Sequence, residues 1–141
     1  AGGRAFVVAS EVAMTHGLAD TTAVPMPVNW AVAGIIVLVA EHIFALATPP
    51  YGLHVPLLFH LTFGSLYAWL AVMVHAGTGW ALILLTTLLA TQSIGRVVVY
   101  LAEDRRHARL LKALLVAGFV VTLITVLLLW LPPSSRDHFF P

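Results

Sequence analysis

The sequence contains no cysteine, and charged residues occupy only 9% of its 141 positions. The absence of cysteine excludes disulfides, thiolate metal ligands and cysteine nucleophiles. A soluble domain is about 25% charged, so this chain has unusually few charged residues. Its residues are 60% hydrophobic, and a soluble fold of this length could not keep so much apolar surface away from water. The formal net charge of +1 also argues against a nucleic-acid partner, because such partners require a broad basic face. The composition therefore indicates a protein that is embedded in a lipid bilayer.

Four long runs of apolar residues make up most of the sequence. A helix of about 20 residues is needed to cross the hydrocarbon core of a bilayer. The sequence has four runs of that length, and the membrane helices predicted from them cover residues 28–47, 56–76, 79–102 and 108–131. Prolines and glycines separate the runs, and the short loops favour antiparallel neighbours. We therefore predict an all-α integral membrane protein, an antiparallel four-helix bundle.

Two mildly polar segments flank this transmembrane domain of residues 28–131. Residues 1–27 are expected to form an outer N-terminal arm, and residues 132–141 a similar, loosely ordered C-terminal tail. Basic residues are concentrated between the third and fourth runs, in the loop 103–112, while each flanking segment carries one. The positive-inside rule predicts a cytoplasmic loop 103–112 with both termini outside. A bacterial inner membrane is the expected location.

Five polar side chains interrupt the predicted membrane helices, and each needs a reason because an ionisable group there costs about 2.5 to 3.5 kcal/mol. They are Glu41, His42, His60, Gln92 and Arg96. At a rise of about 1.5 Å per residue, the ionisable ones fall in one layer of the inner leaflet. The sequence thus predicts a polar layer shared by three helices.

Glu41 and Arg96 are predicted to pair, because neither charge should face lipid alone. Two interpretations of the pair remain open. It can be a structural contact that holds the first and third helices together. Alternatively, it can belong to a proton or quinone site in which Glu41 exchanges protons.

His42 and His60 are predicted to face each other at matching depth on antiparallel helices. Two such imidazoles can ligate the iron of a b haem, with Arg96 binding a propionate and Gly64 giving space for the porphyrin. An iron with two axial histidines needs ring nitrogens about 4 Å apart. Rings in direct contact would instead form a structural polar cluster. A non-haem metal site that also uses His54 is a further, less favoured alternative.

The segment His60 to Trp80, HLTFGSLYAWLAVMVHAGTGW, resembles the histidine-bearing helix of small b-type cytochromes. These subunits anchor dehydrogenases or pass electrons to quinone. The resemblance implies an inner haem ligand at His60 and an outer one at His75. The chain departs from the two-haem pattern, since His75 has no obvious partner histidine.

Three functions follow from these observations. The first is a membrane subunit of a multi-subunit respiratory or photosynthetic electron-transfer complex, which binds haem b or lines a quinone site and contacts other membrane subunits and lipids. The second is a structural accessory subunit without a cofactor. A small transporter is disfavoured, because no inverted repeat is present. The polar segments are too short for a catalytic domain, so we do not expect an enzyme acting alone.

Overall fold

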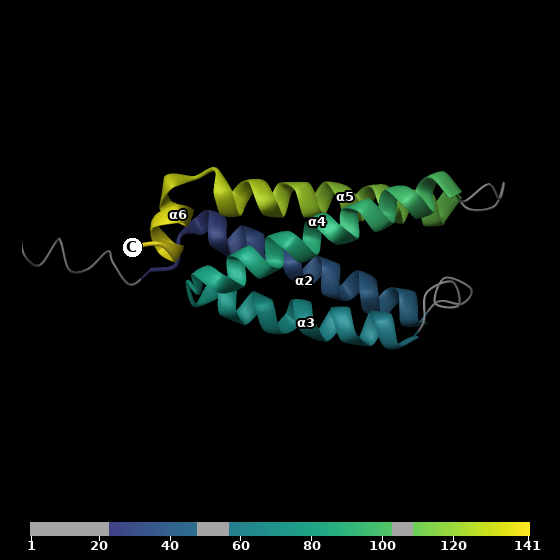
Figure 1. Cartoon of the computed structure of the whole chain (residues 1–141), viewed down its shortest axis with the longest axis horizontal. Helices are drawn as coiled ribbons and strands as arrows, with labels where there is room; N and C mark the ends of the chain where they lie inside the picture. Colours follow the sequence, from purple (N-terminus) through teal and green to yellow (C-terminus); the bar gives the residue numbers. More distant parts are fainter. Residues whose placement is uncertain (1–22, 48–56, 103–108) are drawn as a thin grey trace, which may run out of the picture.

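The computed structural model describes residues 23–47, 57–102 and 109–141, and all of the regular structure in these ranges is helical. The helices are α2 (Met26–Ala47), α3 (Leu57–His75), α4 (Gly79–Ala102), α5 (Arg109–Trp130) and α6 (Pro133–Phe139). The four long helices form an antiparallel bundle, and α6 folds across one end of it (Figure 1). The predicted fold class is confirmed, and the ends of the four long helices differ from the predicted ranges by at most two residues.

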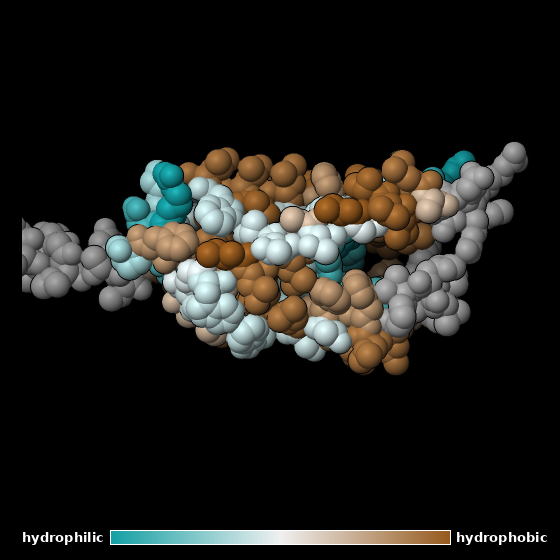
Figure 2. All heavy atoms as spheres, viewed as in Figure 1, coloured by the Kyte–Doolittle hydropathy of each residue, from teal (hydrophilic) through white to brown (hydrophobic). Residues whose placement is uncertain are grey.

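Each of the four long helices is long and apolar enough to cross a membrane. Large hydrophobic side chains are exposed along all four, among them Ile36, Leu61, Val98 and Phe119. Hydrophobic residues cover much of the visible surface of the long helices (Figure 2). Lipid can solvate such a surface and water cannot, so the chain is an integral membrane protein.

Helix α2 packs closely against both α3 and α5. Gly34 permits the approach to α5, because a Cβ atom added there would overlap the hydroxyl of Thr125. Close contact through small residues is the usual way in which membrane helices associate. The half of the bundle near α6, here called the α6 end, is filled by fully buried side chains that include Ile35, Leu70 and Leu82.

The opposite half, here called the Arg109 end, is where α2 and α4 finish and where α3 and α5 begin. Helix α4 starts beside α3 at the α6 end and diverges from it towards the Arg109 end (Figure 1). Its core residues Leu82, Leu85 and Leu89 all belong to its first half. The predicted polar layer lies in this half of the bundle.

The expectation of a loosely ordered C-terminal tail is wrong, because residues Pro133–Phe139 form α6. The hydroxyl of Ser135 donates a hydrogen bond to the Leu128 carbonyl at 2.8 Å. One turn later, Phe139 is buried in the core. A ring nitrogen of His138 lies 3.2 Å from the carbonyl oxygen of His75, at the end of α3. These contacts dock α6 against the bundle as a cap.

Candidate functional site

A cavity of about 460 Å³ lies between the four long helices at the Arg109 end. Its wall on α4 is one helix face, made by Gln92, Gly95, Arg96 and Val99 at spacings of three and four residues. The remaining residues are mostly apolar and come from α2, α3 and α5, with one more from α4. They are Glu41, His42, Phe44, Ala45, Phe59, His60, Phe63, Thr91, Leu111, Leu114 and Leu115. The space-filling view shows a hollow between α3 and α4 with hydrophilic atoms inside it (Figure 2).

Glu41 and Arg96 form a two-pronged ion pair that joins α2 to α4. Both terminal nitrogens of Arg96 donate to the carboxylate, Nη1 to Oε1 and Nη2 to Oε2, the second at 2.8 Å. Bidentate pairs of this kind are among the strongest side-chain contacts. The predicted pairing is confirmed.

Gly118 of α5 lies directly against this ion pair, a contact that was not predicted from the sequence. A Cβ atom added at Gly118 would stand 2.6 Å from Cζ of Arg96 and 2.7 Å from Oε2 of Glu41. Any side chain at this position would therefore push the pair apart. The signal in the sequence was a single glycine inside the strongly apolar helix α5.

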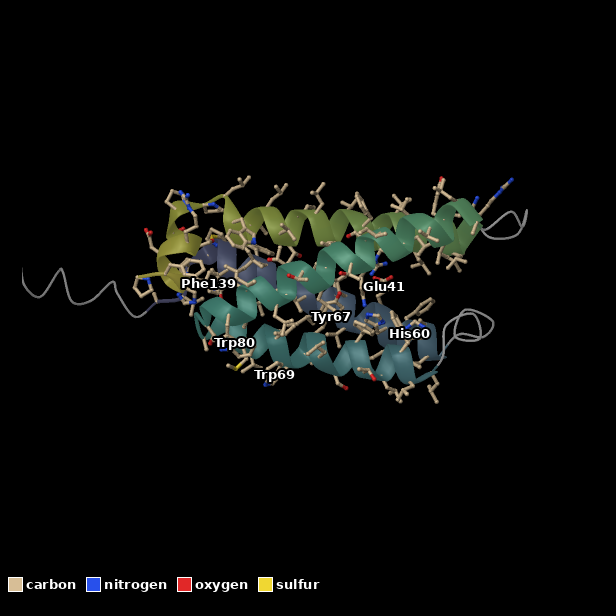
Figure 3. The ribbon with its side chains drawn as sticks, viewed as in Figure 1. Glu41, His60, Tyr67, Trp69, Trp80 and Phe139 are labelled. Carbon is tan, nitrogen blue, oxygen red and sulfur yellow. The ribbon has the colours of Figure 1, made fainter. Side chains whose placement is uncertain are left out.

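His42 and His60 face each other between α2 and α3, as predicted. Their Nδ1 atoms are 3.1 Å apart and hydrogen-bonded, and the ring centroids are 5.3 Å apart. This is the direct contact that we associated with a structural polar cluster, because two axial ligands of one iron need about 4 Å between nitrogens. His60 and Glu41 project into the space between the helices (Figure 3).

Gly64 and Arg96, both expected to serve a haem, have contacts within the protein. A Cβ atom added at Gly64 would lie 3.4 Å from Cβ of His42, an ordinary contact distance, so Gly64 lies beside that histidine. Arg96 uses both terminal nitrogens on Glu41. The geometry therefore favours a hydrogen-bonded network over a porphyrin cradle.

Four buried polar atoms around this network lack a hydrogen-bond partner among the described residues. They are Nε2 of His42, Nε2 of His60, the hydroxyl of Tyr67 and Nε2 of Gln92. Buried polar groups are bonded in the great majority of proteins. The three nitrogens belong to residues that line the cavity, so they can serve a ligand or water there.

Tyr67 also belongs to the site, on the same face of α3 as His60 and Gly64. It is fully buried two turns after His60, and its ring stacks on that of His42 with centroids 5.7 Å apart and an interplanar angle of 27°. The signal was a tyrosine in the middle of a membrane helix, since tyrosines concentrate at the membrane interfaces. Its ring packs against one face of the His42 ring.

The other predicted metal ligands do not join this cluster. His75 ends α3 at the α6 end, where its carbonyl oxygen contacts His138. His54 lies outside the described residues. Within the described ranges, no group of three or more histidine or acidic side chains could hold a metal ion. The sequence-predicted set that comes together is Glu41, His42, His60, Gly64 and Arg96.

Comparison with protein families, with curated sequences and with solved structures finds no match to this chain. The fold and composition define its class as an all-α integral membrane protein.

Proposed function

We propose that this chain is a membrane subunit of an electron-transfer complex, and that its cavity binds the head group of a quinone. The observation that carries the proposal is the set of unpartnered nitrogens on His42, His60 and Gln92 in a mostly apolar cavity. A quinone head group is a flat apolar ring with carbonyl oxygens that accept hydrogen bonds. Binding sites for such ligands are apolar with a few converging polar groups.

The charge of the cavity favours a neutral ligand. Its only charged lining residues among those described are Glu41 and Arg96, which neutralise each other. A haem would bring propionates and need an uncompensated cation, whereas a quinone is uncharged. The aromatic rings of Phe44, Phe59 and Phe63 supply apolar walls for a flat ring.

The position of the cavity favours a ligand that arrives through the lipid. The hollow opens sideways between α3 and α4, in the membrane-spanning part of the bundle (Figure 2). A quinone head group can enter there while its hydrocarbon tail stays in the bilayer. By the positive-inside rule, the basic loop 103–112 would place the Arg109 end of the bundle at the cytoplasmic face of a bacterial inner membrane.

Quinone binding can be tested by filling the cavity from its least constrained wall. Gly95 lines the cavity, and a Cβ atom added there meets nothing within 4 Å. Gly95→Leu should therefore fold normally and occupy ligand space. Ala90→Leu is the matched control, because Ala90 is an exposed residue of the same helix outside the cavity.

A short-tail quinone would be titrated into each protein in lipid nanodiscs, with empty nanodiscs as the blank for partitioning. We expect binding by the native chain and by Ala90→Leu. For Gly95→Leu we expect an affinity at least about tenfold weaker, which corresponds to about 1.4 kcal/mol. Equal affinity of the two variants, or no binding by the native chain, would contradict the proposal.

The same polar layer also supports a second candidate, a structural accessory subunit. The ion pair links α2 to α4, and the histidine pair links α2 to α3. Such contacts can hold a membrane bundle together without any ligand. A native chain that binds no quinone, and whose stability falls when either contact is removed, would favour this role.

A further inference from the structure

We propose that a groove between α4 and α5 at the Arg109 end binds one anionic phospholipid, with its phosphate at Lys112 and one acyl chain in the groove. The two helices pack against each other (Figure 1). The groove has a volume of about 180 Å³ and is lined by Arg96, Val97, Tyr100, Leu115, Val116 and Phe119. Neither Lys112 nor Tyr100 lines the larger cavity, so this lipid site does not depend on quinone binding.

Lys112 is positioned by an aromatic ring of the neighbouring helix. Its Nζ atom on α5 lies over the ring of Tyr100 on α4, 5.0 Å from the ring centroid. A cation over an aromatic face is held there by electrostatic attraction. The ring covers one side of the ammonium group, which has three N–H donors. Among the described residues Lys112 forms no ion pair, so these donors can serve the phosphate of a lipid.

The groove leads from this cation into the membrane-spanning part of the bundle. Val116 and Phe119 follow Lys112 by four and seven residues, which places them about 6 and 10.5 Å further along α5. Residues at these spacings share one face of a helix. On α4, Val97 lies one turn deeper than Tyr100. The cation therefore lies at the membrane end of an apolar groove, which is the order of head group and chain in a phospholipid.

The charge of this end of the bundle favours an anionic lipid. In the sequence, the segment 103–112 carries four basic and two acidic side chains, so its net charge is +2. Arg109 is exposed and lies one turn before Lys112 on the same face of α5. Deeper in the groove, Arg96 is the only charged residue among the described residues of the wall, and Glu41 neutralises it. Basic pockets between membrane helices are known sites for anionic head groups.

A lysine near the end of a membrane helix can also reach the interface without forming a site. Such a side chain attracts anionic lipids from the bulk bilayer and retains none of them. Lys112 differs because it contacts the ring of a second helix beside an apolar groove. A site of this kind holds one lipid molecule, and its affinity depends on both the cation and the groove.

The contribution of the cation can be measured by native mass spectrometry of the purified chain in detergent. The protein would be titrated with phosphatidylglycerol or with phosphatidylcholine of the same acyl chains, which carries the same phosphate but adds a cation. Lys112→Gln removes the charge, and Lys112→Arg keeps both the charge and the contact with an aromatic ring. Arg136→Gln is the matched control, because it removes an exposed cation from α6 at the opposite end of the bundle.

We expect the native chain to bind one phosphatidylglycerol about fivefold more tightly than phosphatidylcholine, which corresponds to about 1 kcal/mol. Lys112→Gln should bind the two lipids equally, whereas Lys112→Arg and Arg136→Gln should keep the preference. Equal binding of the two lipids by the native chain would overturn the proposal. So would a preference that survives in Lys112→Gln, or one that Arg136→Gln abolishes to the same extent.

The contribution of the groove is tested by filling it. Val116→Trp places a large side chain in the groove, and Val120→Trp places the same side chain one turn further along α5, outside it. The two valines are similarly exposed, so both variants should keep the native helicity. We expect Val116→Trp to weaken the binding of phosphatidylglycerol at least about fivefold relative to Val120→Trp, because it displaces the acyl chain. Equal affinities of the two variants would overturn the placement of the lipid in this groove.

Discussion

The ion pair between Glu41 and Arg96 allows the sharpest prediction about stability, because its two members should fail differently when left alone. The guanidinium cannot lose its charge, whereas a lone carboxyl can become neutral by taking up a proton. The Arg96 side chain is also the more enclosed, 10% exposed against 25% for Glu41. Glu41→Leu, which strands the arginine, should therefore harm folding more than Arg96→Met, which strands the glutamate.

The magnitudes follow from the charge that remains. A buried charge without its partner costs about 3 to 5 kcal/mol, so this is the loss expected for Glu41→Leu. A neutral, unpaired carboxyl costs about 1 to 3 kcal/mol, the loss expected for Arg96→Met. The double variant strands nothing, and exchange of a buried pair for apolar residues is often neutral. We expect it within about 1 kcal/mol of the native chain.

Equilibrium unfolding in mixed micelles, with helicity followed by circular dichroism, measures these differences. The double variant is the internal control, because it carries both side-chain replacements but leaves no charge without a partner. The predicted order of stability is native and double variant, then Arg96→Met, then Glu41→Leu. If Glu41→Leu proved as stable as the double variant, the reasoning that the pair exists to neutralise a membrane-buried charge would be refuted.

Three further predictions concern the same layer and the topology. Gly118→Ala should destabilise the chain by about 1 to 3 kcal/mol, the cost of overpacking, because the added Cβ atom would overlap the ion pair. Gly95→Ala should not destabilise it, because a Cβ atom added at Gly95 meets nothing within 4 Å. Equal free energies of unfolding for the two variants would contradict this. Single cysteines introduced at Ala108 and Ser134 should react with an impermeant thiol reagent from opposite sides of the membrane, the second from outside; reaction from one side would refute the topology. Haemin should give no spectrum of a bis-histidine haem, because the two histidines already bond to each other; a low-spin six-coordinate spectrum that requires both histidines would overturn that argument.

The long helices and the depth of the polar layer could be predicted because both follow from simple lengths. A bilayer sets the length of a crossing helix, and a constant rise per residue places Glu41 and Arg96 at one level. Prolines and glycines then mark the ends of the helices. The pairing of the two charges followed from the same reasoning, since lipid offers neither charge another partner.

The separation of the two histidine rings could not be predicted in this way. Matching depth is the same for rings that touch and for rings held apart by an iron. The difference between the two arrangements depends on how closely α2 and α3 approach, which the depth of the two residues does not determine. Gly64, which was expected to give space to a porphyrin, lies beside His42.

The cavity and α6 were missed because each depends on packing between distant segments. The cavity exists because α4 diverges from α3, and a crossing angle leaves no mark on the hydropathy of one helix (Figure 1). Helix α6 has seven residues, too few for a helical period to stand out after two prolines. Its stability comes from the docking of Phe139 and Ser135 against the bundle.

Photo-crosslinking with a light-activated quinone analogue tests the central claim most directly, because it reports where a quinone sits in the bilayer-embedded chain. The protein in nanodiscs would be illuminated with the analogue, digested and mapped by mass spectrometry, with and without an excess of unreactive quinone. We predict labels on the α3 segment that contains Phe59 and Phe63 and on the α4 segment from Gln92 to Val99, with loss of both under competition and in Gly95→Leu. Labels spread over the lipid-facing sides of all four helices and unaffected by competition would contradict a quinone site in this cavity.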